Sequence, residues 1–439
     1  MEDNRFNQTR GSAPRRPRPV RALSHPNEAS TAQPQSVQTP TVAVQDAVTQ
    51  HGQIPETPAK SAEPMPREEK RRPRREKKKR GGAGRIVRRI LLCLLVLLLS
   101  ALYMLFSAVA TVAHGPSETL RDLLVLSAMQ ASATKWVPGL FLSAETVNEI
   151  VENSKKVNTD TVSIEDYGTP AGDDNTQADI WEKAIDGMLF ETVNGSTYKA
   201  YVLLVKDPSR VFVGTSSDFK SGKQGARIFD VAARYDAVAA INGGEFYDAG
   251  GVGTGDNPIG TTYSEGENVW NDGRTNRTFI GFDNENKLVV SEGMSVKQAE
   301  ELGIRDGVCF QTGNVLITHD GDDVTMYYAD KNTGTAQRTA IGQRADGTVI
   351  LLVTDGRSAS SLGATHNDVI DIMVDYGAIT AGMLDGGSSA MMYYENYYDK
   401  YDFDVEQLDQ YQKQGLVNKY KAFTTPRRIP TFFLVARGK

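Results

Sequence analysis

Cysteine is almost absent from this sequence of 439 residues, which contains only Cys93 and Cys309. Because Cys93 lies in a long apolar run, the region that follows it has one cysteine and cannot form an internal disulfide. The same count excludes a Cys₄ or Cys₂His₂ zinc site in that region. If the region is exported, a hydrophobic core must hold it together, which is typical of a bacterial cell-surface protein and not of small disulfide-rich secreted domains.

Aromatic residues are nearly missing from residues 1–66, where Phe6 is the only one. The segment is rich in proline, glutamine, serine, threonine and alanine instead. Such a composition buries too little apolar surface to offset the entropy of the chain. The sequence therefore predicts a disordered tail here, in which no function is evident.

Charge is divided unevenly along the chain. Residues 1–89 hold 20 Lys/Arg against 9 Asp/Glu, a net charge of +11, whereas the other 350 residues hold 29 against 46, a net charge of −17. Much of the basic excess lies in residues 67–89, with 13 Lys/Arg and 3 Asp/Glu. The two parts are therefore expected to lie in different surroundings or to meet different partners.

A charge-free run of 24 residues, Ile90–Ala113, follows the basic segment. It is long enough to cross a bilayer core of ~30 Å as a helix. A cleaved signal peptide is the alternative interpretation. The run starts far from the first residue, its apolar core is long, and no small-x-small cleavage site follows closely, so a retained transmembrane helix is favoured.

The basic flank sets the expected topology, because segments rich in Lys/Arg stay in the cytoplasm. We expect residues 1–89 to be a basic cytoplasmic tail, residues 90–113 to be a single transmembrane helix, and the chain after about residue 114 to be extracellular. The basic run is interpreted first as a topology determinant that contacts anionic lipids. Nucleic-acid binding is the weaker interpretation of this run, and no nucleic-acid partner is expected.

Residues 114–180 are expected to form a helical stalk and linker. Ser117 precedes an amphipathic stretch, and Ser143 begins a second one; serine at such a position caps a helix. Residues 156–178 are polar and acidic and are expected to form a surface loop.

Residues 181–439 alternate short apolar runs with turn residues. This pattern predicts one extracytoplasmic domain of the α/β or α+β class, with a mixed β-sheet flanked by helices. The glycine-rich stretch 249–270 contains neither a Walker A motif nor a dinucleotide fingerprint, so a P-loop is rejected. Strands are expected near 198–205, 210–213, 237–241, 278–282, 348–353 and 431–435, and helices near 226–234, 295–302 and 367–375.

The stretch around Asp385 is the centre of the predicted functional site. A buried-looking strand, Ile379–Leu384, ends at Asp385 and is followed by two glycines and two serines, Gly386, Gly387, Ser388 and Ser389. Glycines let a ligand approach the backbone, and strand-end loops of this kind commonly carry chemistry. An ordinary Asp-Gly turn is the alternative.

Two further predicted strands end in polar turns that contain glycine. One leads into Asn242–Asp248 and the other into Thr354–Arg357, while Arg338 and Arg428 stand in polar contexts beside other strands. Arginine suits phosphate, and paired carboxylates suit glycosyl transfer. The plainer alternatives are that Asp355 and Asp385 cap turns and that Arg338 forms a structural ion pair.

A metal site is not expected, and neither is a cofactor. Calcium is the single metal considered, on the acidic residues Asp248, Asp256, Asp320, Asp322 and Asp323. No EF-hand spacing is present among them.

Six motifs, in this order, resemble the phosphodiester glycosidase family of uncovering-enzyme-like domains and bacterial exopolysaccharide biosynthesis-type proteins. They are INGGEFY, RTAIG, VTDGR, the GAT-helix, MLDGGSSA and RRIP, and the likeness covers roughly residues 190–437. Two positions depart from the family pattern. Glu245 stands where the family usually has an aromatic residue, and the family's DGGGS is shortened to Asp385–Ser388.

The resemblance implies a hydrolase that cleaves a sugar-1-phosphodiester in cell-envelope or exopolysaccharide metabolism, and the expected transmembrane helix makes it membrane-anchored. It implies a carboxylate that acts as base or nucleophile, first Asp385 and then Glu245 or Asp355. Arginines would clamp the phosphate, and polar groups would hold the sugar hydroxyls or phosphate oxygens. The expected binding residues are Asn242, Gly243, Gly244, Arg338, Thr339, Arg357, Thr365, Gly386, Gly387, Ser388, Ser389 and Arg428.

Two other functions remain open on the sequence. One is a non-catalytic module that binds envelope glycans or sugar phosphates with the same groups. The other is a membrane-anchored glycopolymer phosphotransferase, which also needs arginines and carboxylates. A binder would keep its affinity when Asp385 is neutralised, and a transferase would need a polymer acceptor.

Overall fold

The computed structural model describes residues 82–130, 134–167, 180–217, 219, 224–248, 255, 257–330, 333–356, 361–401, 403–404, 406, 408–418 and 425–438. The disordered tail expected over residues 1–66 and most of the basic run lie outside these residues. The chain divides into two compact units, and the boundary between them falls after Tyr103. We describe each unit by itself.

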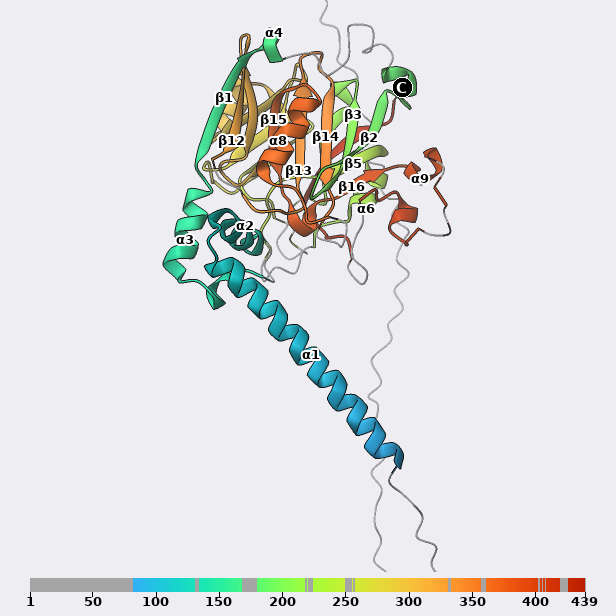
Figure 1. The fold of residues 1–439 in the computed structure, drawn as a ribbon. Helices are drawn as coiled ribbons and strands as arrows, with labels where there is room; N and C mark the ends of the chain where they lie inside the picture. Colours follow the sequence, from blue (N-terminus) through green and yellow to red (C-terminus); the bar gives the residue numbers. More distant parts are fainter. Residues whose placement is uncertain are drawn as a thin grey trace, which may run out of the picture. The chain divides into compact units, whose positions relative to one another are not determined.

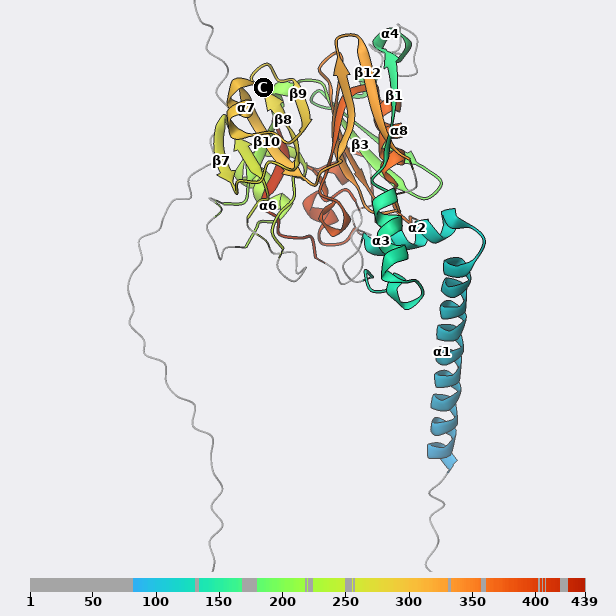
Figure 2. The same cartoon turned by 90° about the vertical axis from the view of Figure 1, so that its left-hand side faces the viewer.

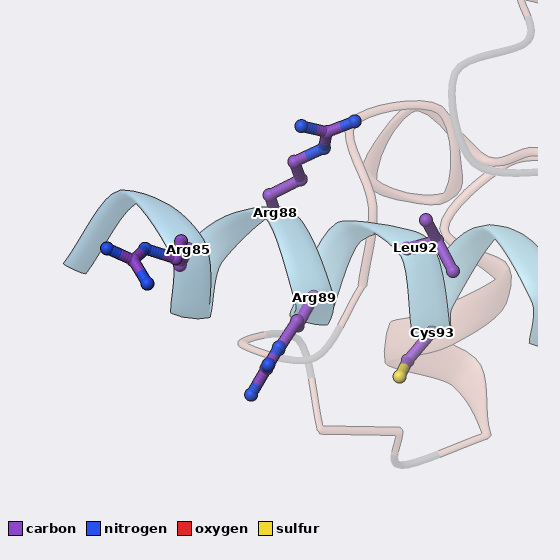
Figure 3. Close-up of a pocket in the computed structure, with 5 residues that line it drawn as sticks. All are labelled: Arg85, Arg88, Arg89, Leu92 and Cys93. Carbon is purple, nitrogen blue, oxygen red and sulfur yellow. The ribbon is translucent and has the colours of Figure 1, made fainter. Parts of the chain in front are cut away.

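Helix α1, Gly82–His114, contains the charge-free run. Its leucines and valines are exposed from Ile86 to Phe106, so no protein core covers this stretch. By length and composition α1 could cross a membrane, and a signal sequence would pass the same test. Figure 3 shows Arg85, Arg88 and Arg89 projecting from its first turns, just before Leu92 and Cys93.

Three short helices follow α1 and form a small core of their own. They are α2 (Glu118–Met129), η1 (Pro138–Leu140) and α3 (Ala144–Asn153). As predicted, Ser117 and Ser143 cap α2 and α3, because each side chain accepts a hydrogen bond from the backbone N–H three residues later. Val125, Leu126, Val147 and Ile150 pack together between the two helices.

The strands of the remaining residues form three β-sheets, and most of these strands are labelled in Figures 1 and 2. The first sheet has eight strands in the order β1-β12-β11-β15-β13-β14-β3-β2. Their bounds are β1 (Val157–Ser163), β2 (Met188–Asn194), β3 (Lys199–Val205), β11 (Val315–Asp320), β12 (Asp323–Ala329), β13 (Thr339–Arg344), β14 (Val349–Thr354) and β15 (Ala378–Leu384).

The other two sheets have five and four strands. The five-stranded sheet has the order β7-β6-β10-β8-β9 and the four-stranded sheet the order β16-β5-β17-β4. Their bounds are β4 (Val211–Thr215), β5 (Ala237–Asn242), β6 (Thr261–Ser264), β7 (Glu267–Asn271), β8 (Thr278–Asp283), β9 (Leu288–Glu292), β10 (Ile304–Phe310), β16 (Met392–Tyr394) and β17 (Thr431–Ala436).

Every pairing between these described strands is antiparallel, so the α+β form of the predicted fold class is the one observed. The mixed strand directions expected from the sequence are not found in the described sheets. Parallel neighbours need a crossover connection, and the described helices do not form one. Residues 157–163, assigned to the linker from the sequence, form β1 and pair with β12 along their whole length.

Helices cover only parts of the sheets. The longest in the domain, α8 (His366–Asp375), packs on β12 and β15 (Figure 1). The shorter α4 (Ile164–Tyr167), α6 (Ile228–Arg234), α7 (Val296–Glu301) and α9 (Tyr397–Lys400) lie at strand ends or beside the smaller sheets. Short 3₁₀ turns complete the set: η2 (Trp181–Lys183), η3 (Pro208–Arg210), η5 (Gly387–Ser389) and η7 (Gln412–Gln414).

The apolar runs explain why the strand ends meet. β14 is buried on both faces, as its unbroken run Val349–Val353 predicts. Thr339 at the start of β13 pairs with Val353 on one side and with Leu384 on the other. The turns that follow β14 and β15 therefore leave the sheet at the same end.

Candidate active site

Asp385 lies where the eight-stranded and the four-stranded sheets touch. Its backbone N–H donates to the carbonyl of Gly243, just after β5, over 3.2 Å. Its carboxylate Oδ1 accepts a 2.9 Å hydrogen bond from the N–H of Gly386. The hydroxyl of Ser389 in the same turn also donates to this carboxyl group. The chain thus holds one carboxyl at the joint between two sheets.

The electrostatic surroundings of Asp385 favour retention of its proton. Burial raises the pKa of the carboxyl to about 6, and the charge of Glu245 adds to this rise. Hydrogen bonds from Ser389 and Gly386 and the positive charge of Arg427 act in the opposite direction. A carboxyl with a pKa near 6 can accept or donate a proton around neutral pH.

Asn242 fixes the position of the Asp385 backbone. Its side chain is completely buried, and its Nδ2 donates a 2.6 Å hydrogen bond to the backbone carbonyl of Asp385. Its Oδ1 accepts hydrogen bonds from the hydroxyl of Thr339 at 2.7 Å and from the N–H of Met391 at 3.1 Å. The structure therefore uses Asn242 and Thr339, both predicted as binding residues, to join three strands.

The turn after β5 allows the closest backbone approach in the site. A Cβ on Gly244 would collide with the carbonyl oxygen of Cys309 in β10, so only glycine fits there. The N–H of Glu245 donates to that same carbonyl. Gly243 also lies close to Thr431 of β17, where a Cβ would be 2.5 Å from the hydroxyl.

Glu245 faces Arg277, a residue that the sequence analysis did not single out. The Glu245 Oε2 accepts a 2.7 Å hydrogen bond from the Arg277 Nε, and both side chains are largely buried. The N–H of Asp385 donates to the carbonyl of Gly243, two residues before Glu245, so the two acidic residues stand on adjoining turns. The charge of Glu245 raises the pKa of Asp385. The structure therefore brings two of the three predicted catalytic carboxylates together.

The Asp385 turn is open to approach on one side. Gly387 has a φ of +61° and no atom within 4 Å of the position that a Cβ would take. Its N–H donates to the carbonyl of Gln337, and Ser388 beside it is exposed. Gly386 lies against that same carbonyl. The glycine and serine backbone can therefore approach a ligand, as the sequence predicts.

Arg427 is the arginine that reaches the Asp385 turn. Its Nη1 donates to the Ser389 hydroxyl at 3.4 Å, and its Nη2 lies 3.3 Å from the Asp248 carboxylate. The sequence predicts a binding role for its neighbour Arg428 instead. Arg428 is half-buried, and its side chain forms no hydrogen bond or ion pair with other residues that the structure describes.

Asp355, the third predicted carboxylate, is buried near the same end of the sheet. Its Oδ2 accepts a 2.9 Å hydrogen bond from the hydroxyl of Tyr201 on β3. Burial and this carboxylate raise the pKa of Tyr201. The side chain of Gln337 fills the space beside Gly356, so Gln337 separates this turn from the Asp385 turn. Arg357 lies outside the described residues.

Arg338 and Thr365 make contacts within the protein. The guanidinium of Arg338 donates to the carbonyls of Ala364 and Gly334, at 3.2 and 3.1 Å. Together with burial, which is the larger cause, its charge lowers the pKa of His366 to about 4. Thr365 caps α8 in a capping box with Asp368. Both predicted binding residues thus stabilise the segment around the start of α8.

The acidic residues considered for calcium do not gather at one place, since Asp248 lies apart from the β11–β12 turn that carries Asp320, Asp322 and Asp323. Asp248 forms an ion pair with Arg427, Asp320 and Asp323 stand opposite each other in the register of β11 and β12, and Asp256 lies outside the described residues. Among the residues that the structure describes, no group of three or more His, Cys, Asp or Glu could hold a metal ion.

Fold and site together define an α+β domain that presents a carboxyl of raised pKa beside an arginine and a glycine-serine turn. Residues 235–436 match the family described as phosphodiester glycosidase. The matched range includes Asn242, Glu245, Asp385 and Arg427.

Several known proteins are similar to parts of the chain. The SPbeta prophage-derived uncharacterized protein YomE of Bacillus subtilis (strain 168) is 44% identical over 61 residues, which is 14% of this chain. The chain spans about a tenth of the length of this curated relative (10%).

Solved structures are similar at lower identity. The catalytic domain of zebrafish N-acetylglucosamine-1-phosphodiester alpha-N-acetylglucosaminidase, auto-inhibited by its pro-peptide, is 16% identical, with 64% of this chain and 88% of that chain covered and a TM-score of 0.42. A putative exported protein from Burkholderia pseudomallei is 14% identical, with 54% and 74% covered and a TM-score of 0.37. A hypothetical protein from Synechocystis is 14% identical, with 56% and 62% covered and a TM-score of 0.36.

Proposed function

We propose that this chain is a membrane-anchored extracytoplasmic hydrolase that cleaves a sugar-1-phosphodiester in cell-envelope or exopolysaccharide metabolism. The single observation that carries the proposal is Asp385, a carboxyl with a pKa near 6 in a ligand-accessible glycine-serine turn. The family match of residues 235–436 supports the same class of reaction.

In this reaction the bond between the anomeric carbon and a phosphodiester oxygen breaks. The departing phosphate monoester is a weak base, so it needs little help from a general acid. The demanding steps are the stabilisation of an oxocarbenium-like transition state and the activation of water. Asp385 in its ionised form accepts a proton from the attacking water, whose oxygen forms the new bond to the anomeric carbon.

Arg427 is the proposed phosphate ligand. Its guanidinium is only partly buried, with Asp248 holding one end and Ser389 contacting the other. Arginine's planar fork suits phosphate oxygens, and the exposed Ser388 lies in the same turn. Glu245, paired with Arg277, is the second carboxylate, placed to stabilise positive charge on the sugar ring.

The membrane part of the proposal depends on α1 and the basic segment before it. The arginines at the start of α1 favour a cytoplasmic N-terminus. The proposal accordingly has the domain that contains residues 235–436 outside the membrane. No cofactor and no nucleic-acid partner are required. The substrate is then a sugar phosphodiester or an envelope glycopolymer that reaches the outer surface.

The test uses the full-length protein in detergent with an N-acetylglucosamine-1-phosphodiester and measures free reducing sugar. We expect release by the natural protein and none by Asp385→Asn. Binding without release, retained by Asp385→Asn, would support a glycan-binding module instead. Transfer to a polymer acceptor without hydrolysis would support a phosphotransferase.

A further inference from the structure

The turn Lys135–Leu142, between α2 and α3, exposes large apolar side chains. Trp136 is 64% exposed and Leu140 is 58% exposed. They stand in the sequence Lys-Trp-Val-Pro-Gly-Leu-Phe-Leu, which has no acidic residue. We call this segment the interfacial turn.

The interfacial turn is joined to the apolar helix by a ring contact. The ring of Phe141 lies 5.0 Å, centroid to centroid, from the ring of Phe106 in α1. At ~1.5 Å per residue, a bilayer core of ~30 Å takes about 20 residues of helix. A core that starts at Ile90 therefore ends near Val109, just beyond Phe106. With the core in that position, Phe141 would contact α1 close to the outer end of the hydrocarbon.

The backbone of the turn is suited to such a position, because four of its N–H groups have local partners. The N–H groups of Val137, Leu140, Phe141 and Leu142 all donate to carbonyls of Thr134, Val137 or Pro138. Unpaired backbone groups are costly near hydrocarbon. Tryptophan is enriched at the membrane interface, where lysine can extend its charge toward the headgroups.

The helix before the turn contacts the site end of the eight-stranded sheet. The hydroxyl of Ser127 on α2 accepts a 3.0 Å hydrogen bond from the N–H of Thr335. Gly334 packs against Leu126 so closely that a Cβ would collide with the α2 backbone. Arg338, four residues on, donates to the carbonyl of Gly334 and directly precedes β13. The end of β13 that begins there is the end where β15 delivers Asp385.

We propose that the interfacial turn inserts into the outer lipid–water interface and holds the site end of the domain at the membrane surface. This inference rests on the proposed membrane anchoring of α1. The occupant of the apolar surface is the bilayer itself, because the surface is continuous with the apolar helix through the Phe106–Phe141 contact. The catalytic turn then works on phosphodiesters at or near the lipid headgroups.

Tryptophan fluorescence tests the proposal on the full-length protein in phosphatidylcholine vesicles. The chain has three tryptophans, so Trp181→Phe with Trp270→Phe leaves Trp136 as the reporter. We expect its emission to fall in vesicles whose acyl chains carry bromine near the headgroup, compared with plain vesicles, and aqueous iodide to quench it weakly. The matched control keeps Trp181 alone, beside β2, and its emission should not respond to brominated lipid.

Three outcomes are distinguishable. Trp136 quenched by iodide and unaffected by brominated lipid, with the protein still resisting carbonate extraction, would overturn the inference and leave the anchor intact. Trp136 shielded from both quenchers would mean that a second copy or another protein covers the turn, which also overturns it. Release of the protein by carbonate would overturn the anchor and the inference together.

A second measurement avoids the tryptophan replacements. Leu140→Cys in a Cys93→Ser background carries a nitroxide label, since Cys309 is buried. We expect its relaxation to respond more to oxygen, which dissolves in lipid, than to a water-soluble nickel complex. The reverse order would overturn the inference.

Discussion

The side-chain amide of Asn242 donates a 2.6 Å hydrogen bond to the backbone carbonyl of Asp385, although the two residues are 143 positions apart. The bond joins the end of β5 to the end of β15, and thus one sheet to another. The catalytic carboxyl of the proposed mechanism is positioned through this contact.

Replacing Asn242 by alanine should uncouple the two strand ends. The change leaves the Thr339 hydroxyl, the Met391 N–H and the Asp385 carbonyl without their partner, and each buried unpaired group costs about 1–3 kcal/mol. We expect a fall of several kcal/mol in the free energy of unfolding, measured by urea denaturation. We also expect sugar release per folded molecule to fall.

Asn418→Ala is the matched control for that variant. Asn418 is also completely buried and bridges the Met392 N–H and the Ala390 carbonyl, but it does not contact Asp385. It should lose stability and keep more of its activity per folded molecule. Equal losses of activity in both variants would show that Asn242 has no special positioning role.

Asp385→Asn should make the protein more stable at pH 7. The folded-state pKa of about 6 exceeds the ordinary value of 3.8, so stability is fully present below pH 3.8 and is lost as pH rises through 6. At pH 7 the ionised carboxyl costs about 3 kcal/mol by this linkage. Urea denaturation should show a gain of up to that size at pH 7 and little gain at pH 4. Glu285→Gln, at an exposed site, should show none.

The rate of sugar release should follow the ionisation of Asp385. As the general base, Asp385 works when ionised, so kcat/KM should rise with pH through about 6 and then level off. A profile that falls through this range would assign Asp385 the role of general acid instead. The measurement is kcat/KM between pH 4.5 and 8.5.

Glu245 and Arg427 should shift this profile in opposite directions. Glu245 raises the pKa of Asp385 and Arg427 lowers it. Glu245→Gln should therefore move the midpoint to lower pH, and Arg427→Gln should move it to higher pH and also raise KM. Arg428→Gln is the control and should leave the midpoint unchanged. A shift in the same direction for Glu245→Gln and Arg427→Gln would contradict the arrangement.

Thr365→Ala should affect the fold more than the chemistry. The Thr365 hydroxyl accepts the N–H of Asp368 as the cap of α8, and loss of such a cap typically costs about 1 kcal/mol. We expect a fall of that size in the free energy of unfolding and an unchanged KM. A raised KM at full stability would show that Thr365 contacts the substrate.

The sequence predicts the parts of this domain that depend on local pattern. Buried strands such as Val349–Thr354 and the capped helices at Ser117 and Ser143 follow from apolar runs and capping chemistry. The strand Val157–Ser163 could not be predicted in the same way. It lies at a sheet edge, is largely exposed, and shows little apolar alternation, so only its pairing with β12 makes it a strand.

The candidate site shows a similar division. The glycines at the strand ends predict that Asn242 and Asp385 belong to the functional site. Their contacts with each other depend on long-range packing, which the local sequence does not determine. The local sequence does not distinguish Arg427 from Arg428 as the arginine that faces Ser389. The position of β17, which follows them, decides that Arg427 faces the Asp385 turn. Arg277 lies far from any motif, and only the folded β8–β10 region brings it to Glu245.

The most direct test of the central claim is to determine which bond of the phosphodiester breaks. Full-length protein would hydrolyse an N-acetylglucosamine-1-phosphodiester in water enriched in oxygen-18, and phosphorus NMR would report whether the phosphate product carries the label. Attack of water at the anomeric carbon predicts a phosphate monoester free of oxygen-18, with no product from Asp385→Asn. Oxygen-18 in the phosphate would mean that the phosphorus–oxygen bond is cleaved and would contradict the glycosidase account.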